Sequence, residues 1–232
     1  MRTQLSYFPL ALMATWSASA LAADAAKPAA KAELSIERAR TAVLVMDYQN
    51  DIVNMMPEKA RSPLLDKASE AVQAARQAGL PIIYVVVRFR DGYPEVSQQN
   101  RRFAGLKESG RLREGSPGAE IHPRLAPQPG DVVVTKRRVG AFSTTDLETV
   151  LRAHNINTLV MFGIATSGVV LSTVRWAADM DYQLVVVSDA SADMDSEVHR
   201  VLTQKILPTQ ATVVTTESLV KALAMPEHKT TP

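Results

Sequence analysis

The sequence of 232 residues contains no cysteine. Disulfide bonds, thiolate metal sites and a cysteine nucleophile are therefore all excluded. The chain also lacks an excess of one charge, with 26 Lys and Arg against 24 Asp and Glu, whereas a dedicated nucleic-acid-binding protein usually carries a concentrated basic stripe. We therefore predict no nucleic-acid partner. Hydrophobic residues make up 46% of the chain, which is enough for one ordinary core and excludes global disorder.

Several motifs with well-understood chemistry are missing as well. No G-x-G-x-x-G follows an apolar run and no G-x-S-x-G is present, so neither a dinucleotide site nor a serine-hydrolase nucleophile turn is indicated. The run from Gly163 to Gly168 has the outer glycines of a phosphate-binding loop, but Val169 and Val170 replace its Lys-Ser/Thr pair. The four histidines are scattered without ligand spacing, so we predict no metal and no cofactor.

Residues 1–22 have the pattern of a secretory signal peptide. Arg2 is followed by a mostly apolar run from Tyr7 to Trp16 and then by small residues up to Ala22. The run is too short to span a bilayer comfortably. We expect cleavage after Ala22, and therefore a periplasmic or secreted protein that has no membrane contact after cleavage; the alternative is a frayed N-terminal helix.

One folded domain is expected after this segment. Residues 23–33 are rich in Ala, Lys and Pro and have no large apolar side chain, which is typical of a flexible leader. Residues 224–232 are predicted to form a polar, frayed tail. The folded domain should therefore cover residues 34–223.

Short apolar runs alternate with helical patterns inside this domain. The runs are β-branched and apolar on both faces, as buried parallel strands are, and cover residues 41–46, 81–87, 131–135, 158–162, 184–188 and 211–214. Helices are predicted at residues 64–79, 144–155, 167–181, 196–207 and 217–223. This alternation predicts an α/β fold, a three-layer, Rossmann-like, doubly wound sheet of about six mainly parallel strands. Residues 89–130 break the alternation, and a loop of this length is usually functional, often a lid.

Charged side chains follow the apolar runs directly. Asp47 follows the first run, Arg88 the second and Lys136 the third. Ligands of open α/β sheets bind outside the carboxyl ends of the strands, so these side chains are expected to converge there. An aspartate beside a lysine can act as a general acid/base pair, because each tunes the charge of the other. A purely structural ion pair is the alternative interpretation.

The segments that follow these runs resemble the isochorismatase-like hydrolases, a superfamily with the cysteine hydrolase fold. The resemblance rests on three ordered motifs, VMDYQND at 45–51, KRRVGAFSTTDL at 136–147 and GIATSGVVLST at 163–173. It covers about residues 41–219, nearly the whole predicted domain. Members of the superfamily often assemble into oligomers, so the resemblance also implies a homo-oligomer.

The resemblance implies a site that lacks its usual nucleophile. Most members have an Asp-Lys-Cys triad, whose positions fall on Asp47, Lys136 and Val169. Because valine has no nucleophilic atom, the thioester route is excluded. The isochorismatases within the superfamily also lack this cysteine and cleave a vinyl ether, with the aspartate as proton donor and no covalent intermediate. By this resemblance Asp47 would protonate the substrate, and Lys136 would hold an oxygen or tune Asp47.

Further residues are candidates for binding the substrate. Arg88 and Arg90 could clamp a carboxylate, although both could equally belong to a solvated loop face. The resemblance implies a non-proline cis peptide at Ile164-Ala165, which would aim N–H groups at an anion where the next helix begins. Ser167 is expected to cap that helix rather than replace the thiol, because no adjacent base would activate it. The complete candidate set is Gln49, Arg88, Arg90, Phe142, Ile164, Ala165, Thr166 and Ser167.

Two functions follow from these observations. The first is an exported hydrolase that acts on a small, carboxylated molecule by non-covalent acid/base chemistry. The second is a non-catalytic protein that binds a small ligand on the same fold. A third interpretation, a structural partner with a vestigial pocket, is disfavoured because both Asp47 and Lys136 are present.

Overall fold

The computed structural model describes residues 34–225. The predicted signal peptide at 1–22, the predicted leader at 23–33 and most of the predicted tail at 224–232 lie outside the described residues. No helix within the described part is long and apolar enough to cross a membrane.

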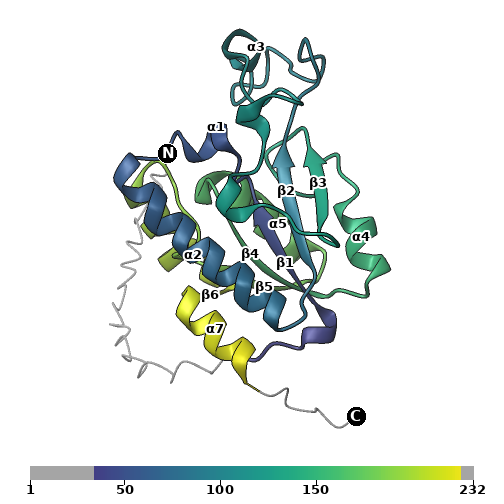
Figure 1. Cartoon of the computed structure of the whole chain (residues 1–232), viewed down its shortest axis with the longest axis vertical. Helices are drawn as coiled ribbons and strands as arrows, with labels where there is room; N and C mark the ends of the chain where they lie inside the picture. Colours follow the sequence, from purple (N-terminus) through teal and green to yellow (C-terminus); the bar gives the residue numbers. More distant parts are fainter. Residues whose placement is uncertain (1–33, 226–232) are drawn as a thin grey trace, which may run out of the picture. The chain divides into compact units, whose positions relative to one another are not determined.

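One parallel sheet of six strands forms the centre of the domain (Figure 1). Its strands are β1 (Thr41–Met46), β2 (Ile82–Val87), β3 (Val132–Lys136), β4 (Thr158–Gly163), β5 (Gln183–Val187) and β6 (Thr212–Val214). In the order β3-β2-β1-β4-β5-β6 the first strand lies in the middle and all neighbours are parallel. Strands β2 and β3 are added on one side of β1, and β4, β5 and β6 are added on the other. This is the doubly wound arrangement that the sequence predicted. The crevice beyond the carboxyl ends of β1 and β4 is the usual ligand site of such sheets.

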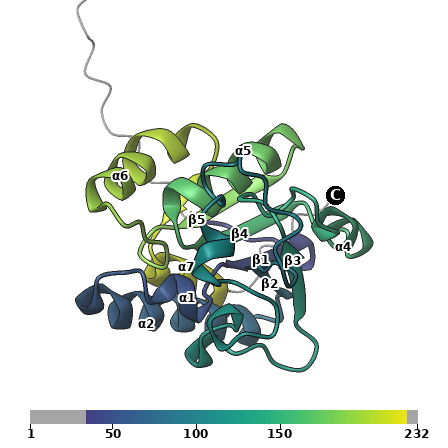
Figure 2. The same ribbon diagram turned by 90° about the horizontal axis from the view of Figure 1, so that it is seen from above.

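Helices cover both faces of the sheet (Figures 1 and 2). One face is packed by α2 (Glu58–Gln77) and α7 (Thr216–Ala224), the other by α4 (Leu147–Ala153), by α5 (Leu171–Asp179) and by Leu202 and Leu207, which follow α6 (Ser196–Val201). Successive side chains of a strand point to opposite faces, so Val43 and Val45 join the first core whereas Leu44 and Met46 join the second. Two apolar cores therefore hold the sheet between two helical layers.

The helices begin at other residues than the sequence predicted. The helix expected from residue 64 begins at Glu58 and contains Pro63, and its first turn is tied down by Arg61, which donates to the carbonyls of Asn54 and Met56. The helix expected from residue 144 begins only at Leu147, because Thr144 has a φ of 64°, a left-handed conformation that no α-helix contains. The helix expected at residue 167 begins as one π-helical stretch, Thr166–Val170.

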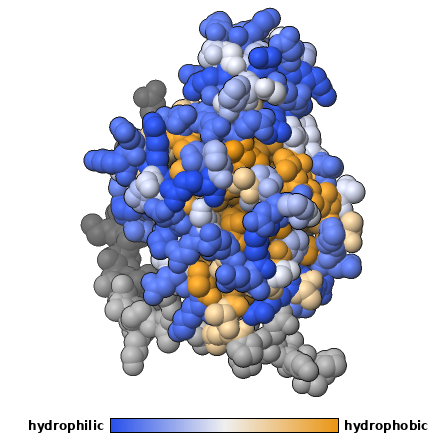
Figure 3. All heavy atoms as spheres, viewed as in Figure 1, coloured by the Kyte–Doolittle hydropathy of each residue, from blue (hydrophilic) through white to orange (hydrophobic). Residues whose placement is uncertain are grey.

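The long segment after β2 has a small apolar core of its own. Phe89, Tyr93, Phe103, Leu106 and Leu112 pack together beside the end of β2. Its short helix α3 (Leu106–Ser109) lies beyond the carboxyl ends of the strands (Figure 1). The outer surface around α3 is mainly hydrophilic (Figure 3). We call residues 89–115 the lid segment; its few apolar side chains hold it together rather than joining the main cores.

Gly163 lets two central strands approach closely at the site. It ends β4 opposite Met46, and a Cβ at this position would lie 2.6 Å from the carbonyl oxygen of Met46. That distance is far inside van der Waals contact, so any side chain would push β4 away from β1.

Gly163→Ala should therefore lower the free energy of unfolding by about 1–3 kcal/mol, the usual cost of overpacking a core. Urea unfolding of the variant and the wild type measures the difference. Gly105→Ala is the matched control, because a Cβ at Gly105 would meet nothing within 4 Å and should change the stability little. Equal stability of the Gly163 variant and the wild type would contradict this account of the strand contact.

Candidate active site

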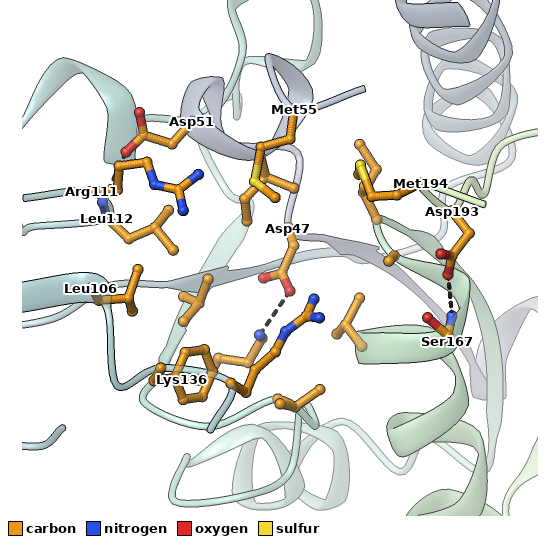
Figure 4. A pocket seen from close by; sticks show the side chains of 18 residues that line it. Asp47, Asp51, Met55, Leu106, Arg111, Leu112, Lys136, Ser167, Asp193 and Met194 are labelled. Carbon is orange, nitrogen blue, oxygen red and sulfur yellow. Dashed lines mark hydrogen bonds and ion pairs between the residues drawn. The ribbon is translucent and has the colours of Figure 1, made fainter. Parts of the chain in front are cut away.

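A cavity of about 320 Å³ lies at the carboxyl ends of β1, β3 and β4 (Figure 4). Asp47, Lys136 and Val169 line it together, as do Ile164, Ala165 and Ser167. The remaining wall comes largely from α1 (Asn50–Val53) and from the lid segment. The cavity is therefore lined by all three implied triad positions and also by the turn that follows β4.

Asp47 and Lys136 form a buried ion pair. The Lys136 Nζ donates to Asp47 Oδ2 at 2.8 Å and to the carbonyl oxygen of Arg138 at 3.2 Å. Asp47 has a φ of 61°, so the chain turns sharply at the end of β1, while its N–H still donates to Val85 on β2. Since β2 lies between β1 and β3, the pair joins two strands that are not neighbours.

Burial dominates the electrostatics of this pair. It raises the pKa of Asp47, although the charges of Lys136 and Arg102 and the hydrogen bond from Lys136 act in the opposite direction. It lowers the pKa of Lys136, against the attraction of Asp47. Asp47 Oδ1 is buried and has no hydrogen-bond partner among the described residues. Asp47 is therefore a carboxyl group that can hold a proton, with one oxygen engaged by a lysine and the other buried without a hydrogen-bond partner among the described residues.

Neither Val169 nor Ser167 offers an activated nucleophile in place of a thiol. Val169 is almost completely buried and contributes only methyl groups to the cavity wall. Ser167 also lines the cavity, but its side chain makes no hydrogen bond to a base among the described residues, and its N–H donates to Asp193 Oδ2 at 2.7 Å. Serine needs an adjacent base for nucleophilic attack. Neither residue is therefore arranged to form a covalent intermediate.

The turn after β4 contains the cis peptide that the resemblance implied, at Ile164-Ala165. Three N–H groups of the turn are already occupied, because Thr166 donates to Ala192, Ser167 to Asp193 and Gly168 to Ala165. These three are therefore not free for an anion, and anion binding by the N–H of Ala165, a residue that lines the cavity, stays a prediction.

Two candidate binding residues near β2 point away from the cavity. Gln49 is fully buried, and its amide donates to the carbonyls of Val87 and Ala119 and accepts from the Val87 N–H, each at 2.8 Å. Arg88 donates to Ala119 and pairs with Glu120 at 3.0 Å. Both side chains thus attach the segment at Ala119 and Glu120 to the sheet.

Three further candidates also lie outside the cavity. Arg90 is exposed and pairs with Glu95 at 2.6 Å. Phe142 packs in the core between the sheet and α4. Thr166 is buried, and its hydroxyl bonds to His199 at 2.8 Å. We therefore do not carry Gln49, Arg88, Arg90, Phe142 or Thr166 forward as substrate ligands.

Two arginines that the sequence did not single out line the cavity instead. Arg102 and Arg111 belong to the lid segment, and neither guanidinium group has a hydrogen bond or ion pair to any described residue. The Arg102 Nη2 lies close to Gly168, 3.7 Å from where a Cβ would stand. The cavity carboxylates differ, because Asp51 accepts from the Leu112 N–H at 2.8 Å and Asp193 from Ser167. The cavity is thus lined by three carboxylates and three cations, and Arg102 and Arg111 are the cations without a hydrogen-bond partner among the described residues.

Metal-binding groups do not gather anywhere in residues 34–225. No three His, Asp or Glu side chains in that range lie close enough together to hold an ion.

Comparison with known proteins agrees with this geometry. The isochorismatase domain family matches residues 41–218. The uncharacterized isochorismatase family protein YwoC of Bacillus subtilis is 33% identical over 188 residues, 81% of this chain and 96% of that protein. The ureidoacrylate amidohydrolase RutB of Stutzerimonas stutzeri is 32% identical over 184 residues, 71% of this chain and 74% of that protein.

A solved structure gives the same result for the fold. A cysteine hydrolase from Pseudomonas syringae pv. phaseolicola superposes with a TM-score of 0.74 at 28% identity, over 82% of this chain and 95% of that chain. The present sequence contains no cysteine, so it cannot use the cysteine to which that protein's name refers. The chain belongs to the isochorismatase family, as a hydrolase that acts on a small molecule.

Proposed function

We propose that this protein hydrolyses a small, carboxylated molecule by non-covalent acid/base chemistry, with Asp47 as the proton donor. The observation that carries the proposal is the state of one carboxyl group. Asp47 is buried, its Oδ2 accepts from Lys136, and its Oδ1 has no partner among the described residues. Val169 occupies the place where a covalent mechanism would need a nucleophile.

The pair suits proton donation in three respects. Burial raises the pKa of Asp47, so the proton is retained to higher pH than on an exposed aspartate. Lys136 engages Oδ2, which leaves Oδ1 to carry the proton towards the substrate. After transfer, the carboxylate that forms is stabilised by the lysine already beside it. General acid catalysis of this kind contributes about 10²–10⁴-fold to a rate.

A vinyl ether is the bond that fits this chemistry best. Asp47 would protonate its alkene carbon, water would add to the resulting oxocarbenium carbon, and the adduct would break into a ketone and an alcohol. The proton released by the water returns to Asp47, so the acid is regenerated. The name of the relative RutB suggests amides as a second bond class. Neither Val169 nor Ser167 provides an activated side-chain nucleophile for an amide carbonyl, so we favour the vinyl ether.

Arg102 is proposed to bind the substrate carboxylate, in place of Arg88 and Arg90. Its guanidinium has no partner among the described residues, and its charge lowers the pKa of Asp47, so it lies within electrostatic reach of the acid. A bound carboxylate would neutralise that charge. The pKa of Asp47 would then rise further, and substrate binding would itself help to keep the acid protonated.

Export and assembly into a homo-oligomer are part of this proposal. Export is supported by the signal-peptide pattern of residues 1–22, and the protein would then meet its substrate outside the cytoplasm. Assembly is supported by the family to which the chain belongs.

Asp47→Asn should lower kcat by about 10²–10⁴-fold, because asparagine has no proton to donate. The assay is mass spectrometry of a mixed panel of vinyl ethers, small amides, ureides and esters with the chain from Ala23 onwards. Circular dichroism checks that the variant is folded. Asp51→Asn is the matched control, since Asp51 also lines the cavity but serves the Leu112 N–H, and it should keep kcat within about tenfold of the wild type.

Either of two outcomes would contradict the mechanism. One is a substrate that the Asp47 variant hydrolyses as fast as the wild type. The other is depletion of an amide only, because water or a nucleophile other than a thiol would then attack the carbonyl, and protonation of a vinyl ether by Asp47 would not be the reaction. Binding of a panel compound without turnover, retained in Asp47→Asn, would support the alternative of a non-catalytic ligand-binding protein.

Lys136→Met should lower the free energy of unfolding by about 3–5 kcal/mol at pH 8, because a carboxylate is left buried without its counter-ion. Without the lysine, the folded-state pKa of Asp47 rises further above its unfolded value. A group with a raised folded-state pKa loses its stabilising contribution as the pH rises through that pKa. The loss relative to wild type should therefore be smaller at pH 5 than at pH 8.

Urea unfolding at both pH values measures this difference. The double variant Asp47→Asn/Lys136→Met contains neither charge and should recover much of the stability at pH 8. Equal losses at both pH values, with no recovery in the double variant, would mean that the pair does not act through its charges.

Arg102→Gln should raise KM for a carboxylated substrate by about tenfold or more, the cost of one charge-assisted hydrogen bond. It should also raise the pKa of Asp47, so the fall of kcat at high pH should move to higher pH. Arg101→Gln is the matched control, because Arg101 is exposed and does not line the cavity. Profiles of kcat and KM against pH for both variants test this, and identical profiles for the two would refute the role of Arg102.

A further inference from the structure

The end of β3 serves the lid segment as well as the cavity. Lys136, the last residue of β3, lines the cavity and pairs with Asp47, whereas the next residue, Arg137, does not belong to the cavity wall. Successive side chains of an extended chain point to opposite sides, which separates the two residues. The Arg137 side chain is only 16% exposed. The chain therefore holds a second buried cation directly after β3, outside the cavity.

Arg137 contacts both ends of the lid segment. Its guanidinium donates to the carbonyl oxygen of Arg88, just before the segment begins, and pairs with Glu114 near the end of the segment. It also pairs with Glu95 at 3.2 Å. Glu95 has a second partner, Arg90, but 64% of that side chain is exposed, so water and salt screen this second pair more strongly. Arg137 is therefore the better shielded counter-ion of a carboxylate that is itself only 13% exposed.

Two backbone hydrogen bonds close the lid segment at its base. Phe89 donates its N–H to the Leu112 carbonyl and accepts from the Glu114 N–H, both at 2.9 Å. The apolar cluster of the lid segment is separate from the two main cores. The contacts of Arg137 at this base, and the bond from the Leu112 N–H to Asp51 on α1 at 2.8 Å, therefore help to hold the segment in place beyond the sheet (Figure 1).

The ion pair of the cavity is connected to the same contacts. The Lys136 Nζ donates to the Arg138 carbonyl at 3.2 Å, and the Arg138 guanidinium donates to the Glu95 carbonyl at 3.3 Å. Arg137 binds the carboxylate of the same Glu95. Three consecutive residues, 136–138, therefore connect the lid segment to the strand end that carries the lysine.

We propose that Arg137 is a positioning residue that latches the lid segment to β3 and so keeps the lid side of the cavity in place. Five lid residues line the cavity: Arg102, Phe103, Leu106, Arg111 and Leu112. Figure 4 shows Leu106, Arg111 and Leu112 on the same side of the cavity. A lid released from Arg137 would take this wall with it, whereas the ion pair belongs to the sheet and would stay.

Loss of the latch should therefore weaken substrate binding more than it slows the chemical step. This consequence for turnover deepens the proposed function and rests on it. The hold of Arg137 on the lid segment does not depend on the reaction, and it can be measured without a substrate.

Hydrogen exchange of the Leu112 N–H tests the latch directly. This N–H donates to Asp51 outside the lid segment, so it becomes free to exchange when the lid moves away. In Arg137→Gln its exchange rate, measured by NMR, should rise about tenfold or more, the effect of losing a hydrogen bond between charged groups. Arg137→Lys keeps the charge but lacks the planar fork that reaches two carboxylates, so it should retain part of the protection.

Two variants are the matched controls. Arg113→Gln removes an arginine whose carboxylate partner, Asp91, belongs to the lid segment itself, and it should leave the exchange rate of the Leu112 N–H unchanged. Leu151→Ala weakens the core at α4, at a fully buried position outside the cavity. It should lower the free energy of unfolding in urea without speeding exchange at Leu112, because the lid opens while the sheet stays folded.

With a substrate from the panel, Arg137→Gln should raise KM about tenfold and change kcat by less. The inference is overturned if the Leu112 N–H exchanges no faster in Arg137→Gln than in the wild type, or if either control speeds it as much. It is also overturned if KM stays unchanged while exchange rises. The proposed function fails separately, through unchanged turnover in Asp47→Asn, which hydrogen exchange does not measure.

Discussion

The ion pair between Asp47 and Lys136 is the constraint on which the rest of the site depends. Two charges taken out of water are tolerated only when they meet in good geometry, and here the donor and acceptor stand 2.8 Å apart. That requirement fixes the ends of β1 and β3 relative to each other across β2. It also explains the left-handed backbone of Asp47, because an extended continuation of β1 would carry the side chain to another place.

The lid segment is held to this edge by polar contacts rather than by the main cores. Arg137 joins the end of β3 to Glu95 and Glu114 of the lid segment, and the amide of Gln49 joins β2 to Ala119, which follows that segment. The contacts of Arg137 engage Glu95 and Glu114. Arg102 and Arg111 have no anionic partner among the described residues, so an anionic ligand would not first have to break an existing pair.

Sequence reasoning located the strands and the ion pair because both depend on local pattern. Buried parallel strands are continuous apolar runs, and the first polar residues beyond two of them, Asp47 and Lys136, meet in the structure. It also selected Arg88, but side chains alternate along β2, so Val87 lines the cavity whereas Arg88 pairs with Glu120. Arg102 and Arg111 could not be selected, since their positions depend on long-range contacts of an aperiodic loop.

The loss of the thiol and the state of Asp47 belong to one arrangement. An aspartate that serves as a base for a thiol must be ionised, which a raised pKa opposes. In the proposed mechanism, which uses no thiol, the same raised pKa is useful, because the carboxyl group can keep a proton and deliver it. The methyl groups of Val169 add apolar surface to the cavity and bring no charge or hydrogen-bond donor that would favour the ionised form. Valine at this position is therefore compatible with an acid at Asp47 in a way that a thiolate would not be.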